Sequence, residues 1–129
     1  DFLALMSDFD SECDLIVGHN IISFDLPFIF QRCLVNNIAV KPFVDLGDFH
    51  VLGVYDTMRG WWLGGRNRVA LDDLAWAFGF ESSKTSEVEG SRVFELYQSG
   101  RLAEIREYNL NDVRVTRKVY ERMIACFGS

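Results

Sequence analysis

The chain has 129 residues, of which 49% are hydrophobic and 14% aromatic, so it is long enough to bury the core of one compact domain. Its apolar runs are too short to cross a bilayer and no signal peptide opens it, which predicts a cytoplasmic protein with no membrane contact. The net charge of −6 argues against a domain that coats duplex DNA by charge alone, and three widely spaced cysteines suggest neither a disulfide framework nor a thiolate metal site.

The first half of the chain predicts two strands that flank a helix. Apolar residues at helical spacing in residues 1–13 (Phe2, Leu5, Met6 and Phe9) predict that the chain begins inside or at the edge of an amphipathic helix. Leu15–Gly18 has the apolar, β-branched composition of a buried strand. A helix follows from Ser23 until Asn36–Asn37, with Pro27 in its first turn and with Phe28, Ile29 and Cys33 directed inward. Val51–Tyr55 predicts the second strand, closed by Asp56–Thr57.

The second half of the chain predicts helices. Leu71–Phe78 reads as a short helix ended by Gly79, residues 81–91 as an exposed and flexible polar loop, and Val93–Gln98 as a second short helix ended by Gly100. Arg101–Cys126 predicts a long helix. Strands that alternate with helices indicate an α/β domain. Two strands form a marginal sheet, so we expect further strands around Ala39–Val44, upstream of the chain, or in both places.

The long C-terminal helix carries one acid in an apolar stripe. Six residues are spaced three or four apart and share one helix face: Ile105, Tyr108, Asp112, Val115, Val119 and Met123. A carboxylate at Asp112 is costly there unless it is paired or binds a metal. Two interpretations stay open, an ordinary pair with an arginine or a cap, and a functional acid. Tyr108 lies one turn before Asp112, where its phenol could orient a reacting water or simply pack in the core.

A second polar segment follows the first predicted strand. Residues 18–28 turn from the strand through His19 and Asn20 into a helix that begins near Asp25. Ligands commonly bind at such strand ends. Asp25 could equally be a helix N-terminal acid that the helix dipole stabilises. Asn20 could be a turn residue, and Phe24 could pack in the core at the helix start.

Together these motifs resemble the DEDDy 3'-5' exonucleases, particularly those related to the proofreading domain of family B DNA polymerases. The second motif of that family matches Gly18-His19-Asn20, Phe24-Asp25 and Pro27-Phe28, and the third matches Tyr108 and Asp112. The segments between them follow the usual course of the family: Tyr55-Asp56-Thr57, Leu71-Asp72-Asp73-Leu74-Ala75, Phe78-Gly79, a loop with Lys84, and Gly90. The resemblance therefore covers nearly the whole chain.

The resemblance implies a ribonuclease-H-like fold, with three layers and a mixed sheet, and two-metal hydrolysis at the 3' end of single-stranded DNA or RNA. It implies that Asp112 and Asp25 bind the metals, that Tyr108 orients the attacking water, and that Asn20 and Phe24 hold the terminal nucleotide. Oxygen ligands of this kind favour Mg²⁺ or Mn²⁺.

The chain departs from the family pattern in its first motif. The early Asp-x-Glu, which supplies the other two acids, has no counterpart here, since Asp8-Phe9-Asp10 has the wrong last residue and lies in a helical pattern. We therefore expect residues 1–129 to be a single, N-terminally truncated exonuclease domain, with little activity by itself. The main alternative is a non-catalytic module that binds nucleic acid or protein on a nuclease fold. An unrelated α/β enzyme is a third interpretation.

The segment Arg59–Arg68 combines arginines with adjacent tryptophans and has no acid. Such a composition suits contacts with a single strand. A solvated loop with core or interface tryptophans is the other interpretation. His19 and His50 are expected to be structural.

Overall fold

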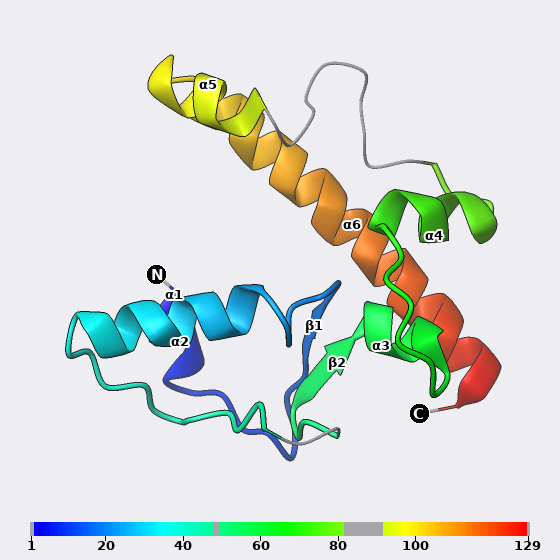
Figure 1. Cartoon of the computed structure of the whole chain (residues 1–129), viewed down its shortest axis with the longest axis horizontal. Helices are drawn as coiled ribbons and strands as arrows, with labels where there is room; N and C mark the ends of the chain where they lie inside the picture. The colour runs from blue at the N-terminus through cyan, green and yellow to red at the C-terminus, as the bar shows by residue number, and fades with distance from the viewer. Residues whose placement is uncertain (1, 48–49, 82–91, 129) are drawn as a thin grey trace. The chain divides into compact units, whose positions relative to one another are not determined.

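The computed structural model describes residues 2–47, 50–81 and 92–128. Backbone contacts divide the chain into two compact units, Asp1–Leu63 and Gly64–Ser129, and each is described by itself. The first unit contains α1 (Phe2–Met6), β1 (Ile16–Gly18), α2 (Asp25–Val35), β2 (Val54–Asp56) and α3 (Thr57–Trp62), and the second contains α4 (Leu71–Ala77), α5 (Val93–Gln98) and α6 (Leu102–Phe127) (Figure 1). The loop predicted at 81–91, with Lys84 and Gly90, lies outside the described residues from position 82 onward.

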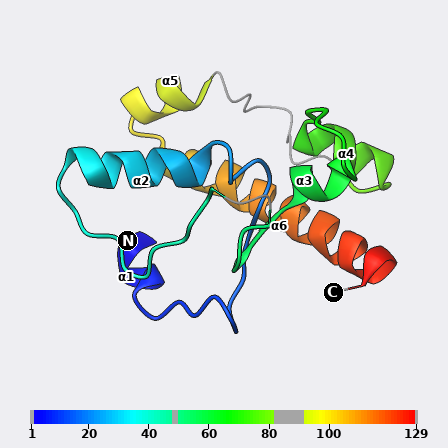
Figure 2. The same cartoon turned by 60° about the horizontal axis from the view of Figure 1, so that its bottom comes forward.

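The two strands of the first unit are parallel neighbours. Ile16 pairs with Val54 and Gly18 with Asp56, and both views show the strands side by side (Figures 1 and 2). Parallel strands end at the same edge of a sheet. The turn that follows Gly18 and the acid that ends β2 therefore meet at one edge, and this edge carries the polar residues of the first candidate motif.

The core of the first unit lies between α2 and the loops and strands around it. Its buried members come from α1, the turn before α2, α2, the segment before β2, and β2: Met6, Ile22, Leu26, Phe30, Val44, Val51 and Val54. Cys33 is buried, as predicted, and Ile29 packs at the margin. Phe28 was predicted to point inward, but the structure contradicts this, since its side chain is 59% exposed. Leu26 and Phe30 occupy the inward face instead.

The predicted boundaries of the first unit are largely correct, with four differences. α1 ends at Met6, so the amphipathic pattern that extended to Phe9 is longer than the helix, and Leu5 is exposed. β2 begins at Val54 because Val51–Gly53 forms a turn in which Gly53 has a φ of +74°. Residues 39–44 do not form a strand. Arg59–Trp62, predicted as part of a loop, forms most of α3.

The second unit is a helical assembly organised by α6. Both α4 and α5 pack against this 26-residue helix (Figure 1). Leu74 and Ala75 of α4 and Val119 of α6 are completely buried. The guanidinium of Arg122 lies over the rings of Phe78 and Phe80, 5.8 and 5.0 Å from their centroids. The bounds of α4, α5 and α6 confirm the predicted helices to within one residue.

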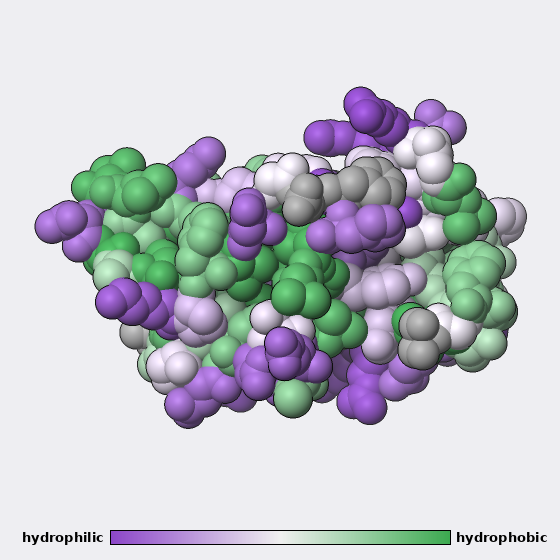
Figure 3. Space-filling model, turned by 90° about the horizontal axis from the view of Figure 1, so that it is seen from below, coloured by the Kyte–Doolittle hydropathy of each residue, from purple (hydrophilic) through white to green (hydrophobic). Residues whose placement is uncertain are grey.

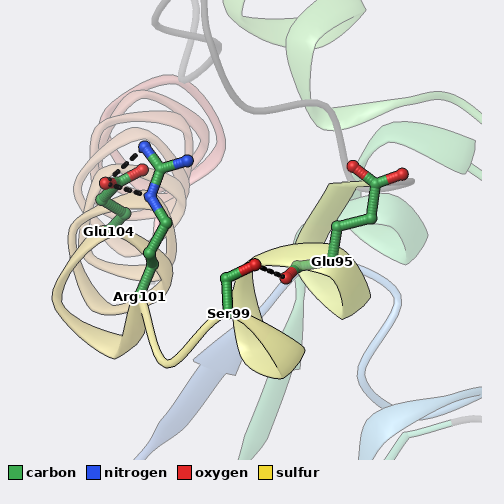
Figure 4. A network of polar contacts seen from close by, with 4 residues as sticks. All are labelled: Glu95, Ser99, Arg101 and Glu104. Carbon is green, nitrogen blue, oxygen red and sulfur yellow. Dashed lines mark hydrogen bonds and ion pairs between the residues drawn. The ribbon is translucent and has the colours of Figure 1, made fainter.

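Local polar contacts define the junction between α5 and α6. Ser99 Oγ donates to the carbonyl oxygen of Glu95 at 2.8 Å, and the Arg101 guanidinium pairs with Glu104 at 2.6 Å (Figure 4). Both contacts are exposed, so they stabilise the turn only modestly.

The described helices contain no segment that is both long and apolar enough to cross a bilayer. Apolar side chains do reach the surface in several places (Figure 3). Phe24 and Phe28 of α2 and Trp76 of α4 are among the exposed ones, with 65%, 59% and 83% of their surface accessible.

One buried carboxylate joins the parts of the first unit. The Asp56 side chain, 4% exposed, accepts hydrogen bonds from the backbone N–H groups of Asn20 at 2.8 Å, Ile22 at 3.1 Å and Met58 at 3.0 Å. The bond from Met58 caps the start of α3. The other two bonds hold the turn between β1 and α2, so a single side chain fixes both sides of the sheet edge.

We expect Asp56→Ala to destabilise residues 1–129 by about 3 to 5 kcal/mol, because three buried or partly buried N–H groups lose their acceptor. Urea unfolding followed by circular dichroism measures this loss. Asp45→Ala is the matched control, since the exposed Asp45 carboxylate accepts one hydrogen bond, from Gly47, and its loss should cost less than about 1 kcal/mol. Equal losses for the two variants would contradict the role given to Asp56.

Candidate functional site

The first part of the candidate site is the turn between β1 and α2. A Cβ on Gly18 would lie 2.2 Å from Cγ2 of Ile21, so the turn closes tightly only because this residue is glycine. Asn20 has a φ of +62°, a left-handed conformation that asparagine tolerates better than most residues. The backbone of Asn20 is held there by Asp56. The structure thus bears out Asn20 as a turn residue, and its predicted contact with a nucleotide stays a prediction.

A threonine and a histidine complete the support of this turn. Thr57, fully buried, donates its hydroxyl proton to the carbonyl oxygen of Gly18 at 3.2 Å. His19 Nδ1 lies 2.9 Å from the same hydroxyl oxygen. The tautomer of His19 decides whether Nδ1 donates to this hydroxyl or accepts from it. His19 therefore has the structural position that the sequence predicts for it.

Asp25 is the first residue of α2, and its side chain is exposed. Neighbouring protein atoms still remove enough water to raise the pKa of the Asp25 carboxyl above its ordinary value, and the negative charge of Asp56 adds to this effect. A hydrogen bond from the backbone N–H of Asp25 opposes both. The Asp25 carboxyl is thus accessible to solvent, while its charged form is disfavoured chiefly by desolvation.

Phe24 immediately precedes Asp25 and is 65% exposed. The alternative in which Phe24 packs in the core at the helix start is therefore wrong. Phe24 and Asp25 lie together at the start of α2 and close to the turn that carries Asn20. These are the three predicted site residues that the structure brings together in the first unit.

The second part of the candidate site lies on α6. The predicted stripe is confirmed, and its burial increases along the helix: Ile105, Tyr108 and Asp112 are partly buried, whereas Val115, Val119 and Met123 are buried. Within residues 2–47, 50–81 and 92–128, no hydrogen bond or ion pair engages the Asp112 carboxylate. The arginine nearest in sequence, Arg114, pairs with Glu107 and Asn111 instead. The alternative of an ordinary arginine pair at Asp112 is not what the structure has.

The predicted acids lie in different units. Asp25 belongs to Asp1–Leu63, and Tyr108 and Asp112 belong to Gly64–Ser129. The described part of the chain holds no group of three or more His, Cys, Asp or Glu side chains placed to bind a metal ion. Asp8 and Asp10 lie between α1 and β1, outside both elements, so they do not take the place of an Asp-x-Glu on a strand. The metal-binding and catalytic roles of Asp25, Tyr108 and Asp112 stay predictions.

Sequence reasoning missed the part that Asp56 and Thr57 play. It took them as the end of a strand and as part of the family resemblance, whereas they anchor the turn that carries Asn20 and leads to Asp25. A usable signal was present, because an acid followed by threonine directly after an apolar strand is a typical N-terminal cap of a helix. The positively charged segment is also partly reassigned, since Arg59, Trp61 and Trp62 belong to α3.

Comparisons with known proteins are consistent along the whole chain. Residues 2–129 match a family described as a predicted 3'-5' exonuclease related to the exonuclease domain of PolB. The chain is 31% identical over 104 residues to a DNA polymerase delta catalytic subunit of Glycine max, which covers 78% of the chain and 8% of that protein. It is 32% identical over 119 residues to one of Oryza sativa subsp. japonica, which covers 88% of the chain and 9% of that protein.

The chain thus spans less than a tenth of the length of these curated relatives. No solved structure matches it. The match over residues 2–129 includes the turn with Asn20 and Asp25 and the helix with Tyr108 and Asp112. The chain therefore belongs to the family of predicted 3'-5' exonucleases related to the exonuclease domain of PolB.

Proposed function

We propose that this chain is most of a ribonuclease-H-like domain that hydrolyses phosphodiester bonds at the 3' ends of single-stranded nucleic acid. The observation that carries the proposal is the Asp112 carboxylate. It lies partly buried on an apolar helix face and has no ion-pair partner among the described residues, in a chain of the exonuclease family. A charge in such a place is costly unless something outside the described chain compensates it.

The two candidate ligands suit Mg²⁺ or Mn²⁺ chemically. Asp25 and Asp112 offer hard carboxylate oxygens, and desolvation, with the charge of Asp56, already disfavours the charged form of Asp25. We propose that Asp112 and Asp25 hold the divalent ions in the complete domain, together with carboxylates that these residues do not supply. When bound, two such ions stabilise the attacking and leaving oxygens of the displacement.

The remaining residues position the substrate in this proposal. The Tyr108 hydroxyl, one helical turn from Asp112, orients the attacking water. Asn20, whose backbone conformation is fixed by Asp56, hydrogen-bonds the terminal nucleotide, and the exposed Phe24 ring packs against its sugar or base. Asp56 keeps Asn20 and the start of α2 in a fixed relation, so binding does not have to order the turn.

Asp112→Asn tests the proposal in the full-length protein. We expect its 3'-directed cleavage of a labelled single-stranded oligonucleotide in Mg²⁺ or Mn²⁺ to fall by about 100-fold or more, because even partners that only support a metal ligand are worth roughly 10- to 100-fold. Glu121→Gln is the matched control on α6. Its carboxylate pairs with Arg117 in solvent, so the rate should not change.

Two outcomes would overturn the assignment. If the full-length protein cleaves neither DNA nor RNA with these metals, the nuclease proposal fails and a non-catalytic binding module on the same fold takes its place. If Asp112→Asn and Glu121→Gln are equally active, the enzyme can remain a nuclease but Asp112 is not its metal ligand. We further expect residues 1–129 alone to show little cleavage, since the early Asp-x-Glu of the resembled exonucleases has no counterpart in this sequence.

The raised pKa of Asp25 predicts a pH dependence of stability in the metal-free chain. A carboxyl group that binds its proton more tightly in the folded state contributes stability below the pKa of unfolded aspartate, about 3.9, and loses it as the pH rises through the folded value. Asp25→Asn removes this titration. Its stability relative to the wild type should therefore be greater at pH 7 than at pH 3.

Urea unfolding of both proteins at the two pH values measures this difference. Asp45→Asn, at an exposed acid in the same unit, is the control for the effect of the substitution itself. Saturating Mg²⁺ should remove the advantage of Asp25→Asn at pH 7 if Asp25 binds the ion. A difference between Asp25→Asn and the wild type that is independent of pH would contradict a raised pKa.

A further inference from the structure

One side of α2 is exposed and takes no part in the core of the first unit. Phe24 and Phe28 are 65% and 59% exposed and lie four residues apart, on one side of the helix. Arg32 and Val35 continue the same side and are exposed as well. We call these four residues the α2 stripe. The opposite side carries Leu26, Phe30 and Cys33, which are buried.

Packing within the first unit does not account for the α2 stripe. The buried side of α2 is the side that packs in the core, to which it contributes Leu26 and Phe30. The ring of Phe43 also contacts Phe30, with centroids 5.8 Å apart, and not the exposed phenylalanines. Two phenyl rings that start directly at a candidate site and continue along a helix therefore suit a surface with a ligand.

The charge of the α2 stripe indicates which kind of ligand it would bind. The first unit is acidic, and its basic residues are Arg32, Lys41 and Arg59. Most of its acids lie in residues 8–14 and 45–48, and α2 contains no acid after Asp25. In the part of the chain that the structure describes, the Arg32 guanidinium takes part in no ion pair. An exposed cation beside aromatic rings is complementary to a phosphate chain with bases.

We propose that the α2 stripe binds the nucleotides that precede the 3'-terminal one in a single strand. Phe28 stacks on a base, and Arg32 contacts a backbone phosphate further along α2. Successive residues at this spacing are about 6 Å apart along the helix axis, so the strand would run from Asp25 along α2. This inference rests on the proposed function, because it extends a strand whose 3' end lies at Asp25.

The test measures binding of a fluorescein-labelled oligothymidylate to the full-length protein in EDTA, over a series of salt concentrations. Phe28→Ala should weaken binding by about 5- to 150-fold, the range for loss of one stacked base. Arg32→Gln should reduce the slope of log affinity against log salt by about 0.7, as expected for one phosphate contact with a single strand. Leu34→Ala is the matched control, because Leu34 is 79% exposed on α2 but lies away from the stripe.

The outcomes separate this inference from the proposed function. With Mg²⁺, Phe28→Ala and Arg32→Gln should raise KM and leave kcat unchanged, since neither residue is placed at the reacting atoms. A wild-type protein that neither binds nor cuts any single strand overturns the proposed function. A wild type that cuts, with Phe28→Ala and Arg32→Gln binding like Leu34→Ala, overturns only the stripe and assigns that face to a protein contact. If Phe28→Ala does not fold, the salt slope of Arg32→Gln alone decides.

Discussion

The buried Asp56 carboxylate is the interaction on which the first unit depends. It accepts hydrogen bonds from Asn20 and Ile22, which lie 36 and 34 positions earlier in the chain, and from Met58, two positions later. The bonds connect the end of β2, the start of α3 and the turn that leads into α2. The conformation of the turn is therefore set by tertiary structure, and Asn20 can keep a left-handed backbone that it would rarely hold alone.

This arrangement gives two nearby carboxylates different chemistry. Asp56 is enclosed and directs its oxygens to backbone N–H groups, so little of its acceptor capacity is left for a ligand. Asp25 is exposed at the start of α2, with a pKa raised by desolvation and by the charge of Asp56. One acid thus holds the turn at the sheet edge, and the other remains open to solvent at the start of α2. Because both residues are aspartates, the difference between them comes from their environments.

Local patterns predicted the second unit well. The bounds of α5 and the stripe of α6 follow from helical periodicity and from glycines just beyond the helix ends, and both depend on residues close in sequence. The first unit was harder to predict because the burial of its side chains depends on contacts between segments that are distant in sequence. Phe28 fits an inward helical pattern as well as Phe30 does, and only the positions of Val44, Val51 and Val54 decide which of them is buried. α3 was missed since Gly60 and two adjacent tryptophans make a weak helix signal.

The candidate site shows the same division between local and distant information. The place of Asp112 on an apolar face could be predicted from spacing alone. That no arginine pairs with it among the described residues could not, because Arg114 is close enough in sequence to pair with Asp112 but pairs with Glu107. A partly buried acid without a partner lowers stability. In the proposed function this position, beside buried Val115 and Val119, is explained by a bound ion, since functional residues are commonly retained at a cost to stability. Asp112 and Asp25 thus share one feature: among the described residues neither carboxylate has an ion-pair partner, and at Asp25 desolvation raises the pKa, with the charge of Asp56 adding to it.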